Sequence, residues 1–402
     1  MKRVNDLYNK INNIDVIMNM YDDVVSKTTK NKRKIMKFDD YYSCNIENIK
    51  KIINNNNYYP NRYNIFFIRE PKLRIIMSQS IKDKVINHLV AKYFLSDVFD
   101  KTLIDKNCAT RIGKGTHYAL KLFKKHYHDC SLQYDKFYIL KFDISKYFYN
   151  IDHDIVKEII SNKIKDKKVI KMVNTIIDST DYSYVNEVIT RLKENEINRI
   201  STLNISKKEK DIKIDEVNKL PLYKKGKGLC IGNMSSQVIA TFYLNELDHY
   251  IKSLGVKYVR YMDDGVLMHS DKEYLKKCLV KIEEILQKYK LVLNKKTKIY
   301  YSNEEVEFLG FRFSISNDLN IIMRLTNKTK KSFKRKMKKM YSNYDLNKCS
   351  YDDMRSVRDS YMGHLRYGDY NNLIRSNIRF GLPDCYINLI FCLFSLRKII
   401  IK

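Results

Sequence analysis

The stretch that decides the fold reads Tyr258-Val259-Arg260-Tyr261-Met262-Asp263-Asp264-Gly265-Val266-Leu267-Met268. Apolar runs flank the turn sequence Asp263-Asp264-Gly265, which predicts two short strands joined in a β-hairpin. Both carboxylates would then lie at the tip of the hairpin. An Asp-Asp-Gly sequence alone also suits an ordinary surface turn, so its meaning depends on what else the fold brings to that tip.

A further acid lies at the end of another predicted strand. Residues 137–142, Phe-Tyr-Ile-Leu-Lys-Phe, have the pattern of a buried strand and lead into Asp143. Asp152 suits the N-cap of a helix that follows. Acids from separate strands that meet at one point could hold two hard metal ions, which prefer carboxylate and phosphate oxygens and catalyse phosphoryl transfer. Asp143 and the Asp263-Asp264 pair meet that requirement.

The remaining pattern predicts an α+β chain of two or three packed subdomains, as 402 residues allow. Residues 1–60 are expected to be mostly helical, and residues 184–220 to form an insertion or peripheral helices. Strands are expected at 66–68, 73–77 and 305–313, and helices at 81–99, 235–251 and 274–289. From Arg324 onward the pattern is helical, and the apolar run Tyr386–Ile401 predicts a buried C-terminal helix.

The chain is strongly basic, with 76 Lys and Arg against 46 Asp and Glu and a net charge of +30. This excess indicates a polyanionic partner such as nucleic acid, although a solvated surface of Lys- and Asn-rich composition would give the same count. Eight cysteines without paired spacing and a polar start without a secretory signal predict a cytoplasmic protein. No apolar run is long enough to span a bilayer, so no membrane partner is expected.

Three segments, in chain order, resemble the sequence motifs of reverse transcriptases. Phe142–Phe148 resembles motif A, Gly228–Gln237 resembles motif B, and Tyr261–Asp264 matches motif C. Residues 308–311, Phe-Leu-Gly-Phe, resemble the primer-grip region. Joint occurrence in this order is far more specific than any one motif. The Ser-Gln end of motif B resembles bacterial enzymes of diversity-generating retroelements, abortive infection and related defence systems, whereas Cys230 stands where these usually carry proline.

This resemblance implies a right-hand polymerase with fingers, a palm built on an antiparallel sheet, and a helical thumb. It implies that Asp143 and Asp263 hold two Mg²⁺ ions, with Mn²⁺ as an alternative, and that Asp264 completes the acidic cluster. Phe148 would be the steric gate against a ribose 2′-hydroxyl, although a core Phe at a helix start gives the same pattern. The surface beneath the nascent base pair would include Gln237, and motif C would add Tyr261 and Met262.

Several cations are expected to contact phosphates. Arg69, Lys72 and Arg74 lie on the predicted finger hairpin, where they could hold the triphosphate of an incoming nucleotide, or simply be solvated. Arg111 resembles a residue of a second finger motif that contacts the template. Lys296 resembles the motif D lysine, which could protonate the departing pyrophosphate or simply contact phosphate; other lysines lie within four positions, so its assignment stays open.

The expected domains are an N-terminal helical extension (1–60), fingers and palm (61–315), and a helical thumb with the C-terminal helix (316–402). Residues 324–339 carry nine Lys or Arg and no acid, which suits either a thumb that grips a nucleic-acid duplex or a solvated basic helix. The region 184–220 would be an insertion within the second domain.

The function expected from the resemblance is that of an RNA-directed DNA polymerase that extends a primer with dNTPs by two-metal phosphoryl transfer. Its partners would be an RNA template, expected to be a dedicated non-coding RNA, and the DNA product, with an accessory protein as a further candidate. Antiphage defence is the favoured role. The alternatives are the enzyme of a diversity-generating retroelement, an untemplated or protein-primed DNA polymerase, and a catalytically silent nucleic-acid-binding scaffold. The intact acidic triad argues against the last.

Overall fold

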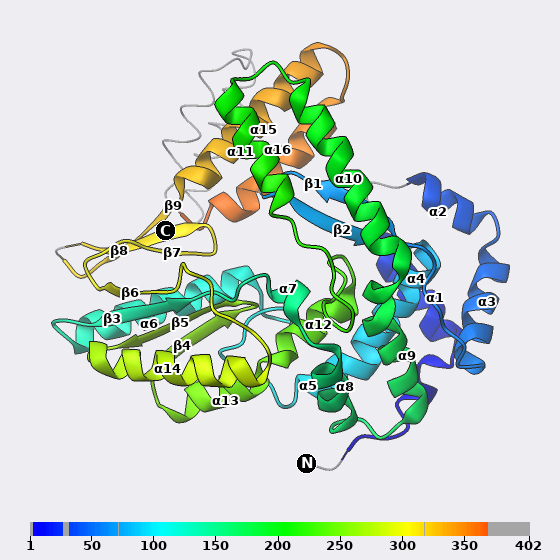
Figure 1. Cartoon of the computed structure of the whole chain (residues 1–402), viewed down its shortest axis with the longest axis horizontal. Coiled ribbons are helices and arrows are strands. Elements are labelled where there is room, and N and C mark those ends of the chain that lie inside the picture. Colours follow the sequence, from blue (N-terminus) through cyan, green and yellow to red (C-terminus); the bar gives the residue numbers. More distant parts are fainter. Residues whose placement is uncertain (1–2, 27–31, 71, 317, 369–402) are drawn as a thin grey trace, which may run out of the picture. The chain divides into compact units, whose positions relative to one another are not determined.

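The computed structural model describes residues 3–26, 32–70, 72–316 and 318–368. Within these ranges the chain is α+β, with helices α1 to α16 and strands β1 to β9 in separate sheets (Figure 1). The chain divides into two compact units. Unit 1 contains Met1–His126 and Phe137–Tyr300, and unit 2 contains Tyr127–Lys136 and Tyr301–Lys402.

The centre of unit 1 is an antiparallel sheet with the strand order β4-β5-β3-β6. Its strands are β3 (Tyr138–Phe142), β4 (Lys257–Tyr261), β5 (Asp264–His269) and β6 (Lys298–Tyr301). β5 lies between β3 and β4, and Phe142 pairs with Gly265 while Tyr261 pairs with Asp264. This register puts the end of β3 beside the tip of the β4–β5 hairpin.

Helices enclose this sheet because its strands carry apolar residues on both faces. α14 (Lys272–Lys288) packs on β3 and β5 and buries Leu275 and Ile282 completely. The surrounding helices are α7 (Tyr147–Asn150), α8 (His153–Ser161), α9 (Lys167–Ile177), the 3-10 helix η3 (Asp178–Asp181), α12 (Met234–Tyr243) and α13 (Asn245–Ser253). α12 is buried on nearly all sides, which explains its run of apolar and small residues.

The N-terminal part of unit 1 is helical. It comprises the 3-10 helix η1 (Tyr8–Ile11), α1 (Ile14–Ser26), α2 (Lys32–Asp39) and α3 (Tyr42–Asn54), which pack on one another and on α4 (Ile81–Leu89). α4 continues through the π-helix η2 (Val90–Ser96) into α5 (Asp97–Phe99). On α3, the buried residues Ile46, Ile49 and Ile53 follow helical spacing, so one face supplies the core.

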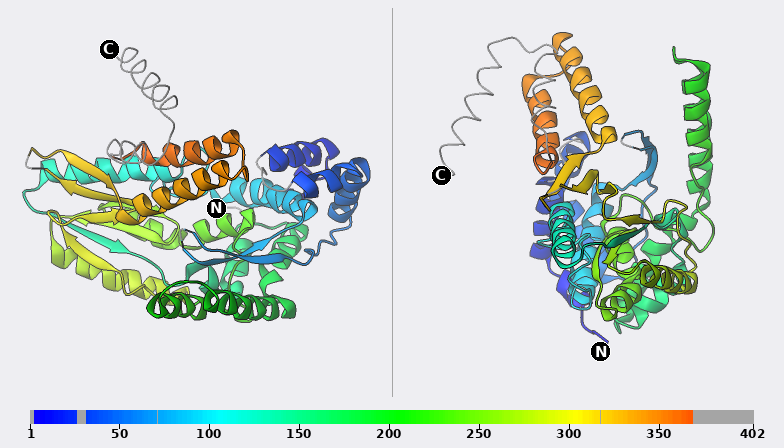
Figure 2. Two further views of the ribbon diagram at one scale, coloured as in Figure 1. Left: turned by 90° about the horizontal axis from the view of Figure 1, so that it is seen from above. Right: turned by 90° about the vertical axis from the view of Figure 1, so that its left-hand side faces the viewer.

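A two-stranded hairpin, β1 (Asn64–Ile68) and β2 (Arg74–Ser78), follows α3. The long helix α10 (Ser183–Ser201) packs against β1 and against α11 (Lys207–Asn218); α10 is the long green helix at the edge of unit 1 in Figure 2. These two helices occupy the region expected to hold an insertion or peripheral helices. A further helix, α6 (Thr116–Gln133), contributes residues to both units.

Unit 2 combines a small sheet with two helices. The sheet contains β7 (Val306–Phe308), β8 (Phe311–Ile315) and β9 (Ile321–Leu325), and the helices are α15 (Asn327–Asp345) and α16 (Tyr351–Leu365). α15 packs against α16 and buries Phe333, Met337 and Met340 on one face. Its basic residues are therefore left for the other faces.

The structure confirms the expected α+β class, the N-terminal helices, the two hairpins and the N-cap of α8, where the Asp152 side chain accepts from the N–H of Ile155. Three expectations need correction. The helix expected over 235–251 breaks at Leu244, and the one over 81–99 contains a π-helix. Arg324 lies in β9, because the helix that follows starts only after its N-cap Thr326. The helix expected at Tyr386–Ile401 lies outside the described residues. None of the described helices is long and apolar enough to cross a membrane.

Candidate active site

Asp143 and Asp263 come together at one end of the central sheet. Asp143 follows Phe142, the last residue of β3, and Asp263 lies in the two-residue connection between β4 and β5. The backbone around Asp143 is held by the 294–297 loop: its carbonyl accepts from the N–H of Asn294 at 2.7 Å, and its N–H donates to Oγ1 of Thr297 at 3.4 Å. The two carboxyl groups are close enough to form a hydrogen bond when one is protonated.

The hairpin tip has the backbone that this approach requires. Met262 has φ of 56°, a left-handed conformation that a non-glycine residue seldom adopts. Gly265 lies opposite Phe142, and a Cβ there would be 2.1 Å from Cζ of the Phe142 ring. The glycine after the two acids is thus favoured by packing, since a side chain there would either drive the hairpin away from β3 or force the Phe142 ring to turn.

The electrostatics differ between the two adjacent acids of motif C. Burial first, and then the neighbouring carboxylates of Asp143 and Asp264, raise the pKa of Asp263 to about 7. Burial also raises the pKa of Asp264, but Lys141, whose Nζ lies 3.6 Å from Oδ1 of Asp264, opposes that rise. Asp263 therefore faces Asp143, whereas Asp264 already has a cationic partner.

The donor set at this end of the sheet fits a hard divalent cation. Asp143 and Asp263 offer adjacent carboxylate oxygens, which are the ligands that hard divalent cations prefer. The three acids do not converge as tightly as His153, Asp178 and Asp181, the one group of three such side chains in the described part of the chain whose ligand atoms all lie within 4.8 Å.

Backbone hydrogen bonds join motif B both to motif A and to strand β2. The N–H of Leu229 donates to the carbonyl of Phe148 at 2.7 Å, and the carbonyl of Ile231 accepts from the N–H of Met77 in β2 at 2.9 Å. Gly232, with φ of 131°, approaches β2 so closely that a Cβ would lie 2.8 Å from the Met77 carbonyl oxygen. Gln237 is half-buried in the first turns of α12. Gly232 is thus the point at which motif B approaches the backbone of β2, and a side chain there would clash with it.

Cys230, where the resembling enzymes usually carry proline, is fully enclosed. Its Sγ lies 3.4 Å from Oγ of Ser179, and burial raises the pKa of its thiol to about 11. The residue packs with Tyr63 and Tyr223 in a small apolar cluster beneath the β1–β2 hairpin. The departure from proline therefore places a neutral, buried side chain in the loop that leads into α12.

Phe148 is half-buried in α7, where its side chain packs on the core of unit 1. Phe148→Val is expected to lower discrimination against ribonucleotides by about tenfold or more, because a smaller wall no longer excludes a 2′-hydroxyl. The measurement is the ratio of ribonucleotide to deoxyribonucleotide incorporation. Tyr147→Phe, which removes a buried hydroxyl bonded to the Ala240 carbonyl, serves as the control with an unchanged ratio. An unaltered ratio in Phe148→Val would assign Phe148 to the core alone.

The cations of the β1–β2 hairpin differ in their surroundings. Lys72 and Arg74 are exposed. Arg69 instead donates to both carboxylate oxygens of Glu196 in α10, which also binds Arg199. These hydrogen bonds, with Arg69 as the largest contributor, lower the pKa of Glu196 to about 2. Lys72 and Arg74 are therefore better placed than Arg69 to meet a triphosphate from solvent.

The loop before α6 contacts motif C. Arg111 is largely buried and donates to the backbone carbonyls of Ile104 and Asn107, at 2.8 and 3.1 Å. Its guanidinium thus holds the shape of the loop. Oγ1 of Thr116, at the start of α6, lies 3.2 Å from the hydroxyl of Tyr261. Sδ of Met262 lies 3.5 Å from Oγ1 of Thr241 in α12. Both motif C side chains are therefore fixed by neighbouring elements.

Lys296 is exposed, and its charge is among those that oppose the rise that burial causes in the pKa of Asp264. Lys298 lies over the ring of Tyr300, with Nζ 4.6 Å from the ring centroid. The assignment of Lys296 stays a prediction.

Lys141 was not predicted from the sequence as a site residue, although it pairs with Asp264. It lies two residues before Asp143 on β3, and alternate residues of a strand share a face. A lone lysine within the apolar run Phe137–Phe142 was the available signal. Arg260, directly before motif C, was also overlooked, although a charged residue inside a buried strand is unusual.

A second polar cluster lies between α8 and motif B. Nε2 of the buried His153 donates to the Gly228 carbonyl at 2.8 Å, and Nδ1 lies 3.2 Å from Asp178 and 3.6 Å from Asp181. Lys157 also binds Asp178. Both ring nitrogens therefore face acceptors, which favours the imidazolium form. Burial acts to lower the pKa of His153, but the hydrogen bond to Asp178 and the other contacts outweigh it and raise the pKa.

This cluster predicts a pH-dependent contribution to stability. Because the pKa of His153 is raised in the folded state, its contribution is complete below the unfolded value of about 6.5 and is lost as pH rises through the folded pKa. Hydrogen bonds to charged groups contribute about 1.5–3 kcal/mol, so His153→Gln should cost about that much at pH 6 and less at pH 9. Denaturant unfolding at both values tests this. A cost that stays constant with pH would mean that His153 is neutral.

Comparison with known proteins identifies the family. Residues 68–313 match the family model described as Reverse transcriptase (RNA-dependent DNA polymerase), which is more than half of the chain. The chain therefore belongs to the reverse transcriptase family. Its antiparallel sheet with surrounding helices is the palm of a right-hand polymerase.

Two solved structures are similar to this chain. One is apo telomerase from Candida tropicalis truncated from the C-terminal domain, at 15% identity and a TM-score of 0.41, with 64% of this chain and 54% of that chain covered. The other is apo telomerase from Candida tropicalis, at 17% identity and a TM-score of 0.41, with 65% and 48% covered. The chain thus spans about half the length of these two proteins. No curated protein matched the sequence.

Proposed function

We propose that this protein extends a primer on an RNA template by two-metal phosphoryl transfer. The observation that carries the proposal is the meeting of Asp143, at the end of β3, and Asp263, in the β4–β5 turn, as adjacent half-buried carboxyl groups. Membership of the reverse transcriptase family supports the same chemistry. Two carboxylates held side by side repel each other unless a cation binds between them, so a site that keeps both serves a purpose other than stability.

Asp143 and Asp263 would hold the Mg²⁺ ions, for which Mn²⁺ is an alternative, and Asp264 would support them from its place beside Lys141. When bound, such ions neutralise the charge that develops on the attacking and leaving oxygens. The chain's own residues orient the reactants. Lys72 and Arg74 bind the triphosphate from the β1–β2 hairpin, and Lys296 contacts the departing phosphate.

The proposed duplex-binding part is unit 2. Its helix α15 contains most of the basic region 324–339, and α16 covers the apolar face of α15, which leaves lysines on the other faces of the helix to meet phosphates. In this proposal residues 1–60 form an N-terminal extension, 61–315 the fingers and palm, and 316–402 the thumb. The template is a dedicated non-coding RNA, and synthesis takes place in the cytoplasm as part of antiphage defence, with an accessory protein as a further partner.

The test is incorporation of labelled dNTPs by the full chain, purified with its bound RNA and supplied with Mg²⁺. Synthesis that needs the RNA and is lost in Asp263→Asn supports the proposal. Synthesis that survives complete removal of RNA supports an untemplated or protein-primed polymerase instead. No incorporation by a folded sample with any template would overturn polymerisation and leave a nucleic-acid-binding scaffold. Sequencing of the DNA made in cells then separates defence from diversity generation, because a retroelement of the latter kind produces a mutated copy of one target.

A further inference from the structure

Arg260, the residue directly before motif C, is completely buried and paired with one acid. Its side chain and that of Asp248 in α13 are both 0% exposed. Nε donates to Oδ1 of Asp248 at 2.7 Å and Nη2 donates to Oδ2 at 2.6 Å. This two-point contact satisfies the charge of the guanidinium, as a buried arginine requires.

The same guanidinium makes two further contacts with main-chain groups of the active site. Nη1 donates to the carbonyl oxygen of Met262 at 2.7 Å, and Nη2 donates to the carbonyl oxygen of Thr241 in α12 at 2.8 Å. One side chain therefore joins the turn of motif C, the helix of motif B and α13. These contacts also satisfy N–H groups that the Asp248 carboxylate does not reach, as burial of a guanidinium requires.

The Met262 carbonyl belongs to the peptide group whose N–H is that of Asp263. The orientation of this peptide group therefore sets the direction in which the Asp263 side chain leaves the backbone. Met262 holds a left-handed conformation, which costs about 1–2 kcal/mol for a non-glycine residue unless its surroundings fix it. Arg260 thus binds the oxygen end of a peptide group whose nitrogen belongs to Asp263.

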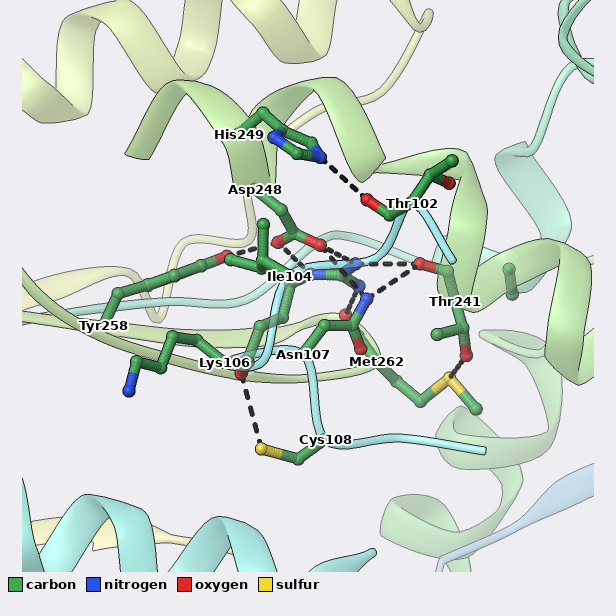
Figure 3. Close-up of polar contacts among 12 residues, drawn as sticks. Thr102, Ile104, Lys106, Asn107, Cys108, Thr241, Asp248, His249, Tyr258 and Met262 are labelled. Atoms are coloured by element: carbon green, nitrogen blue, oxygen red, sulfur yellow. Dashed lines mark hydrogen bonds and ion pairs between the residues drawn. The ribbon is translucent and has the colours of Figure 1, made fainter. Parts of the chain in front are cut away.

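Asp248 is itself held firmly. Its Oδ1 accepts from the hydroxyl of Tyr258 at 2.8 Å and its Oδ2 accepts from Nδ2 of Asn107 at 3.1 Å, as Figure 3 shows. The backbone of Arg260 is held from the same side: its carbonyl accepts from the N–H of Cys108, and its N–H donates to the Lys106 carbonyl. The guanidinium consequently has little freedom to follow a shift of the turn.

We propose that Arg260 is a positioning residue that fixes the Met262–Asp263 peptide group and so orients the Asp263 carboxylate to bind metal. The inference rests on the proposed function, which it deepens by naming the residue that sets the metal geometry. Lysine at this position keeps the positive charge next to Asp248 but lacks the planar fork, so it cannot serve Asp248, Met262 and Thr241 together.

The experiment compares wild-type protein with Arg260→Lys. Mn²⁺ binding is followed by electron paramagnetic resonance, and the signal that persists in Asp263→Asn is subtracted as binding elsewhere. Removal of a group that orients a metal ligand costs about 10–100-fold in metal affinity, and we expect a loss in that range. We also expect kcat for dNTP incorporation to fall about 100-fold, with KM for dNTP changed less than about threefold, because the nucleotide-binding cations are untouched.

A matched control separates positioning from stability. Ile282→Ala empties a fully buried position on α14, away from the acids, and should lower the melting temperature without changing Mn²⁺ affinity or kcat of the folded protein. Should Arg260→Lys fail to fold, the double variant Arg260→Gln/Asp248→Asn, which removes both charges together, takes its place. Mn²⁺ affinity and kcat within about threefold of wild type, in a folded variant, would overturn the inference.

The two proposals can fail separately. Wild-type protein that binds Mn²⁺ through Asp263 but incorporates no nucleotide would overturn the proposed function, while the loss of Mn²⁺ affinity in Arg260→Lys would still support the positioning role. Wild-type protein whose Mn²⁺ binding does not depend on Asp263 would overturn the positioning role directly. If wild type and Arg260→Lys incorporate nucleotides equally well, the proposed polymerase function is supported and the positioning role of Arg260 is overturned.

Discussion

Asp263→Asn should abolish nucleotide incorporation and leave the fold intact. We expect the rate to fall at least about 1,000-fold, equivalent to about 4 kcal/mol of transition-state stabilisation, because the amide cannot serve as an anionic metal ligand. The fold should survive because asparagine matches the shape of the carboxyl group. Single-nucleotide extension under saturating dNTP and Mg²⁺ measures the loss.

For the same variant we expect no loss of stability at high pH, in contrast to its loss of activity. Burial raises the pKa of Asp263 to about 7, so the folded state binds this proton more tightly than the unfolded state does, and the group costs stability as pH rises from about 4 to 7. At pH 8 in EDTA, Asp263→Asn should therefore melt at or above the wild-type temperature. Added Mg²⁺ should stabilise wild type but not the variant.

Asp97→Asn, on the exposed end of α5, is the matched control. It makes the same chemical change far along the chain from motif C, and it should leave incorporation and the response to Mg²⁺ unaltered. If Asp263→Asn keeps more than about a tenth of the wild-type rate, its carboxylate is not a required metal ligand.

Gly265→Ala should disrupt the site through packing and leave its acids chemically intact. The new Cβ would lie 2.1, 2.4 and 2.7 Å from three carbons of the fully buried Phe142 ring. Because β3 and β5 pair directly at these residues, the strain must either separate the strands or turn the ring. We expect a loss of about 3 kcal/mol or more in unfolding free energy, measured with denaturant, and a loss of incorporation.

Two further variants test whether the clash with Phe142 causes the loss of stability in Gly265→Ala. Phe142→Leu combined with Gly265→Ala should recover part of the stability that Gly265→Ala loses, since the smaller side chain relieves the overlap; a double-mutant cycle measures that coupling. Gly363→Ala in α16, where a Cβ meets no atom within 4 Å, should be neutral or stabilising, because alanine favours a helix over glycine. Additive effects of the Phe142 and Gly265 changes would contradict the proposed clash.

Local patterns were sufficient to predict most elements of unit 1. Alternation around Asp263 and Asp264 predicted the hairpin, and a capping aspartate predicted the start of α8. The errors have physical causes that no local pattern carries. Leu244 ends one helix and begins the next inside a single apolar stretch, so periodicity continues across the break. Arg324 belongs to a strand whose pairing partner, β8, determines its conformation.

The residues of the site were predictable from the sequence where the chemistry requires particular side chains. They were less predictable where tertiary packing determines which partner a side chain contacts. Carboxylates before and within turns indicated Asp143 and Asp263, and the structure brings these two together. Nothing in the sequence revealed that Arg69 would bind Glu196, which lies 127 positions further along the chain. The same holds for the buried pair formed by Arg260 and Asp248, since each would be expected at the surface by composition alone.

That buried pair also limits how the protein can evolve. Loss of either partner leaves one uncompensated charge in the interior, which costs about 3–5 kcal/mol and would unfold many variants of a marginally stable enzyme. Single substitutions that remove the charge at position 248 or 260 should therefore be selected against, and the two charges can be lost only together. A library that randomises both codons at once would reach neutral replacements that stepwise mutation does not, and its survivors would reveal which of them still present the hairpin tip to a metal.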